Sequence, residues 1–270
     1  MSKLCFIGGG NMARSLIGGL IERGTDAASI GVAEPADAAR QALATDFGVA
    51  TSADNLAIAA SAEIWILAVK PQVMGAVCRS LAGLNRPALA ISIAAGVTLG
   101  QLRGWLGAAP RLVRVMPNTP ALVGEGISAL CGEAGLADGD WQTTERIFAA
   151  VGETVRVPDE GLMDAVTAVS GSGPAYFFAV IEAMQAAAIE QGLPPDTARR
   201  LVLRTAIGAA RMALPGDPDA AELRRRVTSP GGTTAAALGV LERAGLARMM
   251  SSAIAAATER GRQLAAEQES

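Results

Sequence analysis

A run of apolar residues that ends in three consecutive glycines is the feature that most constrains how this chain can fold. Leu4–Ile7 leads into Gly8, Gly9 and Gly10, and small and apolar residues at helical spacing follow. The pattern predicts a strand, a tight turn and a helix, with a G-x-G-x-x-A spacing that ends at Ala13. Such glycines permit the sharp turn and let the backbone approach a pyrophosphate. Free N–H groups at the helix start would then bind a dinucleotide.

Strands and helices alternate after this turn. Further strands are predicted at 29–34, 48–50, 63–69, 88–93 and 111–116, with helices between them at 36–47, 55–60, 72–81 and 99–106. Two weaker strands, 126–130 and 154–157, flank a helix that begins near Trp141. This alternation predicts an α/β fold with an N-terminal Rossmann-type parallel sheet and helices on both faces.

From Glu160 onward the strand pattern stops. Alanine-rich helices bounded by glycine and proline are predicted at 161–169, 174–191, 196–214, 233–243 and 247–267. A serine of the 170–173 segment is expected to be the N-cap of the second helix. We therefore divide the chain into a dinucleotide-binding Rossmann domain at 1–158 and a helical substrate-binding and dimerisation domain at 159–270. Helices this rich in alanine make a thin core, so burial against a second copy is expected. A monomeric bundle is the alternative.

The composition argues against several classes of protein. With 23 basic and 26 acidic residues the net charge is −3, which disfavours nucleic acid as a partner. No apolar run is long enough to span a membrane, and Asn11 and Arg14 interrupt the apolar start as a signal peptide. Cys5, Cys78 and Cys131 lie far apart in apolar stretches, so we expect buried free thiols and a cytoplasmic protein.

Two scarce residue types limit the possible chemistry. The chain contains no histidine, which removes Ser-His-Asp and Cys-His nucleophiles and His-ligated zinc together, and no metal site is expected. Its lysines are Lys3 and Lys70, so a reaction that needs a lysine has one realistic candidate, Lys70.

The carboxyl ends of further strands extend the predicted cofactor site. Glu34 ends the second strand, where a carboxylate accepts from a ribose 2′-hydroxyl and repels a 2′-phosphate, which favours NADH over NADPH; a solvated helix-capping acid is the alternative. Residues 68–71 and 93–95 should line the nicotinamide half, although Lys70 could equally be a surface lysine before a turn. The predicted cofactor-binding residues of these segments are Ile7, Gly8, Gly9, Gly10, Asn11, Met12, Ala13, Glu34, Ala68, Val69, Lys70, Pro71, Ile93, Ala94 and Ala95.

A second glycine turn opens a helix late in the chain. Its residues are Ser229, Pro230, Gly231, Gly232, Thr233 and Thr234, and their N–H and hydroxyl groups form an anion-binding nest. The first glycine turn is already expected to bind the cofactor phosphates. The second nest would therefore suit a small carboxylate substrate. Asn118, in the proline-rich loop 117–120, is predicted to form a wall of the substrate site, with an ordinary turn as the alternative.

Five strings of sequence together resemble pyrroline-5-carboxylate reductase across essentially the whole chain. They are IGGGNMA at 7–13, AVKPQ at 68–72, VRVMPNTPA at 113–121, AVSGSGPAYFF at 168–178 and VTSPGGTTAAAL at 227–238. The last two are the most specific. The resemblance implies a Rossmann domain followed by a helical domain that intertwines with its twin, in dimers that often assemble into decamers. It also implies that Asn55 binds the cofactor.

By this resemblance, the chain would transfer hydride from NADPH or NADH to C5 of 1-pyrroline-5-carboxylate and yield L-proline. An imine becomes electrophilic on protonation, so orientation and electrostatics could supply most of the rate without histidine. Ser229 and Thr234 are the predicted catalytic residues. The nest, Gly231, Gly232 and Thr233 included, would bind the carboxylate while the Thr234 hydroxyl donates toward the ring nitrogen; Tyr176 is a lesser candidate. Glu34 departs from the small polar residue usual in the family, whose common cofactor is NADPH.

The sequence argues against two other functions and leaves a third open. A β-hydroxyacid dehydrogenase would use a lysine of the second domain, and no lysine follows Lys70. A reductase of a different imino acid would share every motif, because pocket volume is not readable from sequence. A non-catalytic NAD(P) sensor would not need a second anion nest.

Overall fold

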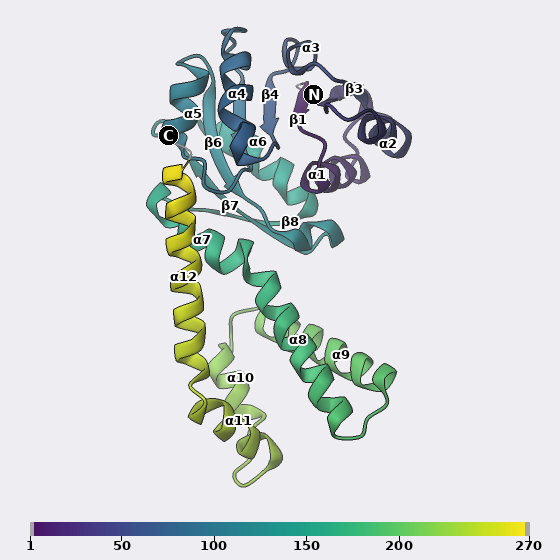
Figure 1. Cartoon of the computed structure of the whole chain (residues 1–270), viewed down its shortest axis with the longest axis vertical. Coiled ribbons are helices and arrows are strands. Elements are labelled where there is room, and N and C mark those ends of the chain that lie inside the picture. The colour runs from purple at the N-terminus through teal and green to yellow at the C-terminus, as the bar shows by residue number, and fades with distance from the viewer. Residues whose placement is uncertain (1–2, 268–270) are drawn as a thin grey trace. The chain divides into compact units, whose positions relative to one another are not determined.

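An eight-stranded sheet carries the N-terminal part of the chain. The computed structural model describes residues 3–267, and its strands lie in the order β3-β2-β1-β4-β5-β6-β7-β8 (Figure 1). Their bounds are β1 Leu4–Ile7, β2 Ile30–Ala33, β3 Ala50–Ser52, β4 Ile64–Leu67, β5 Leu89–Ser92, β6 Arg111–Met116, β7 Gly126–Gly132 and β8 Gly152–Arg156. Neighbouring strands are parallel except for the antiparallel pair of β6 and β7. The predicted Rossmann-type α/β fold is confirmed.

Helices cover both faces of this sheet because its strands are apolar on both sides. In β1, Leu4 and Phe6 join a buried cluster with α1 and α6, whereas Cys5 and Ile7 join another with α4 and α5. Continuous apolar runs are typical of parallel strands that are buried on both faces. The helices of this part are α1 Asn11–Glu22, α2 Asp37–Phe47, α3 Asn55–Ala59, α4 Pro71–Ala82, α5 Leu99–Leu106 and α6 Asp138–Phe148.

A buried ion pair fixes the segment that follows the sheet. Arg114 of β6 is 4% exposed, and its guanidinium donates to Glu160 Oε1 at 3.1 Å. The same carboxylate oxygen accepts from the backbone N–H of Leu99 at 2.7 Å, and Asp164 lies 3.8 Å from the other side of the guanidinium. Asp164 belongs to α7 (Met163–Val166). Charge-assisted bonds of this kind satisfy a buried arginine that would otherwise be strongly destabilising.

The last helix returns to the sheet. Residues 3–172 and 255–267 form one compact unit, and residues 173–254 form another, so α12 (Leu246–Glu267) contributes to both. In the first unit, Gln101 Nε2 donates to the carbonyl of Ala265 at 3.0 Å. A Cβ on Gly96 would lie 3.4 Å from that of Leu264, so the loop after β5 packs directly on the end of α12.

The second unit is helical and largely exposed. It contains α8 Gly173–Glu190, α9 Pro195–Ala213, α10 Ala220–Arg226, α11 Thr233–Arg243 and the first turns of α12. Helix α8 packs on α9, yet Gly173 is its one buried residue in the described chain. The large apolar side chains that it and its neighbours expose include Phe177, Phe178, Met184, Leu201, Ile207, Met212, Val240 and Leu241. Exposed apolar surface on this scale is typical of an association interface.

Three local expectations were wrong. The third strand begins at Ala50 rather than at Gly48, because Gly48 adopts φ +70° and caps the end of α2. Ser170 is not an N-cap: its hydroxyl donates to the Val166 carbonyl at 3.0 Å, inside a π-helical turn at Thr167–Gly171 that joins α7 to α8. Helix α10 was missed because it carries no apolar period.

In the part of the chain that the structure describes, no helix combines the length and apolar character needed to cross a membrane.

Candidate dinucleotide and substrate sites

The three glycines of the first turn differ in what surrounds them. Gly8 has φ +102°, and a Cβ there would lie 2.6 Å from the carbonyl oxygen of Ala68. A Cβ on Gly9 would lie 2.6 Å from Leu43 Cδ1. Around Gly10, by contrast, no heavy atom of the described chain lies within 4 Å of that position. The first two glycines are therefore required by the fold, while Gly10 keeps a space open.

That open space lies at the start of α1. Gly10 is its N-cap, no side chain caps the helix, and the first helical bond runs from Arg14 N to the Gly10 carbonyl at 2.9 Å. The N–H groups before Arg14 in the first turn therefore have no partner within the helix, and the positive end of the helix dipole lies at the same place. An uncapped helix start beside an open glycine fits the pyrophosphate of a dinucleotide.

Glu34 lies at the same turn. It follows β2, and its Oε2 accepts from the backbone N–H of Gly9 at 2.9 Å. Its Oε1 accepts from Ala36 N at 3.0 Å. Two backbone donors therefore hold the carboxylate beside the glycines. The sequence does not indicate the bond to Gly9, because the two residues are 25 positions apart. Asn55 begins α3, three residues after the neighbouring β3 ends, and is half-buried.

The other predicted cofactor segments gather at one edge of the sheet. Residues 68–71 follow β4 and residues 93–95 follow β5. Strand β4 lies between β1 and β5 and is parallel to both, so the carboxyl ends of all three strands lie at the same edge of the sheet. Lys70 is exposed and precedes α4, whereas Ala94 is buried. This edge of the sheet is formed by backbone and small side chains, which would leave room for a flat nicotinamide ring.

Asn118 is buried and is held by a hydrogen bond to the neighbouring strand. It is 9% exposed, two residues beyond the end of β6, and its Oδ1 accepts from Ile127 N of β7 at 2.9 Å. Its oxygen therefore stabilises the end of the sheet. The amide hydrogens are the part of the side chain left for a ligand.

The second glycine turn belongs to the helical unit. Gly231 has φ +70°, Gly232 is the N-cap of α11, and no side chain caps this helix either. Ser229 folds over the turn: its Oγ lies 2.5 Å from where a Cβ on Gly232 would stand. Thr234 lies in the first turn of α11 and is half-buried. The first N–H groups of α11 therefore follow a glycine turn without a side-chain cap.

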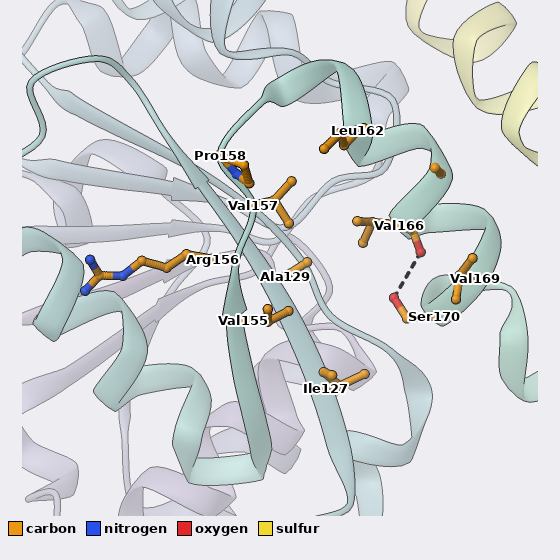
Figure 2. Close-up of a pocket in the computed structure, with 11 residues that line it drawn as sticks. Ile127, Ala129, Val155, Arg156, Val157, Pro158, Leu162, Val166, Val169 and Ser170 are labelled. Atoms are coloured by element: carbon orange, nitrogen blue, oxygen red, sulfur yellow. Dashed lines mark hydrogen bonds between the residues drawn. The ribbon is translucent and has the colours of Figure 1, made fainter. Parts of the chain in front are cut away.

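A further hollow is apolar and has no catalytic character. The groove, about 420 Å³ in volume, lies between β7, β8 and the α7 region (Figure 2). Figure 2 shows Ile127, Val155, Val166 and Val169 lining it, with the Ser170 hydroxyl turned to Val166. Ser170 is the residue of the SGSGPAYFF segment that lines the groove, and its hydroxyl is already engaged.

The thiols take no part in a nucleophilic site. Cys5, Cys78 and Cys131 are free and buried. Burial raises the pKa of the Cys78 thiol to about 12 and raises the pKa values of Cys5 and Cys131 as well. Thiols held in the protonated form are poor nucleophiles.

Sequence reasoning missed two residues that support these segments. Arg40 donates to the carbonyl oxygens of Glu34 and Pro35, and Gln101 ties the first turn of α5 to α12. The role of Arg40 could have been suspected from the sequence, because Asp37 and Arg40 are spaced to pair on one face of a helix. Nothing local indicates the second, because its partner lies 164 residues away.

Comparison with known proteins gives matches to both parts of the chain. Residues 160–264 match the family described as pyrroline-5-carboxylate reductase dimerisation, and residues 3–96 match NADP oxidoreductase coenzyme F420-dependent. The pyrroline-5-carboxylate reductase of Pseudomonas aeruginosa is 45% identical over 97% of both chains. The match at 160–264 identifies the helical part as a region of self-association.

Solved structures agree. A pyrroline-5-carboxylate reductase from Coxiella burnetii superposes with a TM-score of 0.92 at 41% identity, covering 97% of this chain and 98% of its own. The Plasmodium falciparum enzyme, solved with NADP bound, gives 0.88 at 30% identity over 98% of each chain. On its fold, its two glycine turns and its relatives, this chain belongs to the pyrroline-5-carboxylate reductase family.

Proposed function

We propose that this protein reduces 1-pyrroline-5-carboxylate to L-proline with NADH or NADPH, the last step of proline biosynthesis. The observation that carries the proposal is the pairing, in one chain, of a glycine turn kept open at Gly10 with a second nest at Ser229–Thr234. Relatives that carry this activity in their names share 40–46% identity with nearly the whole chain. A reductase of another imino acid is the second candidate.

In this proposal residues 1–158 hold the cofactor. The N–H groups at the start of α1 bind the pyrophosphate, Glu34 and Asn55 face the adenosine half, and residues 68–71 and 93–95 line the nicotinamide half. The bound cofactor supplies the hydride. The chain supplies orientation, because the small side chains at the sheet edge leave room for ring and substrate to stack.

Residues 159–270 provide the substrate nest and the contacts between copies. The backbone N–H groups of Gly231, Gly232 and Thr233 bind the substrate carboxylate, with Ser229 beside them, and the amide hydrogens of Asn118 add a donor. The Thr234 hydroxyl donates toward the ring nitrogen and orients the imine. The exposed apolar helices favour a dimer, which could assemble further into a decamer. Three buried free thiols favour the cytoplasm.

The direct test follows absorbance at the reduced-nicotinamide band with purified protein, pyrroline-5-carboxylate, and NADH or NADPH in parallel. We expect rapid oxidation with proline as the product. Dinucleotide binding without oxidation on this substrate would point to another imine, and failure on a panel of cyclic and open imino acids would leave the non-catalytic sensor.

Thr234→Ala is expected to reduce kcat/KM for the imino acid by about 5- to 150-fold, equivalent to ~1–3 kcal/mol for one lost hydrogen bond. Affinity for the dinucleotide should stay unchanged, because the nest and the first glycine turn bind different molecules. Thr234→Ser, which keeps the hydroxyl, is the matched control and should restore most of the rate. Normal kinetics for the alanine variant would show that the hydroxyl is not engaged.

A further inference from the structure

The turn after β2 is held by an arginine that the reaction itself does not use. Arg40 lies in the first half of α2, and its side chain is 18% exposed. One guanidinium nitrogen, Nη1, donates to two carbonyl oxygens, those of Glu34 and Pro35, each at 2.7 Å. The other, Nη2, pairs with the carboxylate of Asp37. The guanidinium thus clamps the backbone on which the Glu34 carboxylate stands.

Glu34 is consequently fixed at both ends. Its backbone carbonyl accepts from Arg40, and its carboxylate accepts from the N–H groups of Gly9 and Ala36 at 2.9 and 3.0 Å. A carboxylate restrained in this way needs little further ordering to accept from a ribose hydroxyl, so less conformational entropy is lost on binding. The same restraint prevents it from swinging aside for a phosphate.

The positive charge of Arg40 is also withheld from the ligand. A 2′-phosphate would bring about two negative charges to a turn that already holds the Glu34 carboxylate. The guanidinium that could neutralise it is occupied by two carbonyls and by Asp37. Arg14, the arginine on the first turn of α1, is paired with Asp46 and stacks over the Phe47 ring at 5.1 Å.

We infer that Arg40 is a positioning residue that sets cofactor specificity: with Asp37, it holds Glu34 at the glycine turn and makes the chain selective for NADH over NADPH. This inference rests on the proposed function only in requiring that a dinucleotide bind at the first glycine turn.

The test measures equilibrium binding of NADH and NADPH by nicotinamide fluorescence, and of ADP-ribose and its 2′-phosphorylated form by displacement. We expect the unaltered protein to bind NADH at least about tenfold more tightly than NADPH. Arg40→Met should weaken NADH binding about 3- to 10-fold, as for the loss of about one hydrogen bond, and should leave NADPH binding unchanged. The value of kcat at saturating NADH should not change, because the clamp is at the adenosine end.

Three companion variants separate positioning from simple structural damage. Arg40→Lys can still donate to the two carbonyls and should restore part of the NADH affinity. Asp37→Asn removes the ion pair of Arg40 Nη2 and should tighten NADPH binding about two- to fivefold. The double variant Asp37→Asn with Arg40→Met should lose this gain, because the freed guanidinium is then absent. Arg156→Met is the control: it removes an arginine of β8 that pairs with Glu145 of α6, and it should leave both affinities unchanged.

Two results would overturn the inference: an unaltered protein that prefers NADPH, or variants at Arg40 that weaken both cofactors equally. If Arg40→Met does not fold, the same decision follows from Arg40→Lys and Asp37→Asn. A protein that binds neither dinucleotide nor either ADP-ribose refutes the proposed function instead, so the two failures are distinguishable.

Discussion

Gly10→Val is expected to weaken the binding of NADH and NADPH at least about 100-fold, equivalent to ~2.8 kcal/mol, while the protein remains folded. The N-cap backbone of Gly10, at φ −69° and ψ −177°, is extended and open to any residue, and the described chain places no heavy atom within 4 Å of a Cβ there. The valine would therefore fit the protein and fill the space in front of the α1 N–H groups. Fluorescence titration and a thermal unfolding curve measure the two effects.

Two other glycines provide the comparison. Gly104→Val, on the exposed side of α5, also has an open Cβ position and should leave dinucleotide affinity unchanged. Gly8→Val should lower stability as well as binding, because its Cβ would meet the Ala68 carbonyl. Unchanged dinucleotide affinity in Gly10→Val would show that the pyrophosphate does not approach this turn, and the proposed cofactor site would then be wrong.

Gly152→Ala is expected to lower the free energy of unfolding by about 4 kcal/mol or more. Gly152 begins β8 with φ +152°, a conformation that side chains rarely adopt, and it pairs with Gly126 at the start of β7. A Cβ on Gly152 would stand 1.9 Å from the Gly126 carbonyl oxygen. Since backbone atoms cannot give way as a flexible side chain can, β8 would have to separate from β7. Urea unfolding measures the loss.

Gly135→Ala separates the collision from the cost of the backbone conformation. Gly135 also has a positive φ, +81°, but its Cβ position is open within the described chain. Its substitution should cost only ~1–2 kcal/mol. If Gly152→Ala proved no more destabilising than this control, the contact between the starts of β7 and β8 would be looser than the structure indicates.

Much of the fold was predictable because its periodic segments are locally consistent. The helices at 99–106 and 233–243 and the strand at 111–116 have the predicted bounds. Residues that usually start or end helices were less reliable guides. The serine and glycine residues at 170–173 predict a helix start, yet the chain continues through them as a π turn into α8. Helix α10 depends on its Asp219 cap and on arginine–glutamate pairs rather than on an apolar stripe.

The candidate sites were predictable as residue types but not as contacts. The spacing of Gly8, Gly10 and Ala13 predicts a turn, because that backbone geometry is set by near neighbours. The bond from Gly9 to Glu34 and the clamp by Arg40 depend on how β1 and β2 align, which no local pattern contains. The position of Asn118 against Ile127 likewise depends on β7 running antiparallel to β6.

The return of α12 to the sheet has a consequence for how this protein is made. A ribosome delivers the chain from its N-terminus, and domains generally fold as they emerge. The unit that contains the sheet is discontinuous, since residues 255–267 complete it after the whole of 173–254 has been synthesised. The strands and first helices can therefore form early in translation. The first turn of α5, which Gln101 ties to Ala265, must wait for almost the last residues of the described chain. The sheet unit and the helical unit therefore cannot mature strictly one after the other.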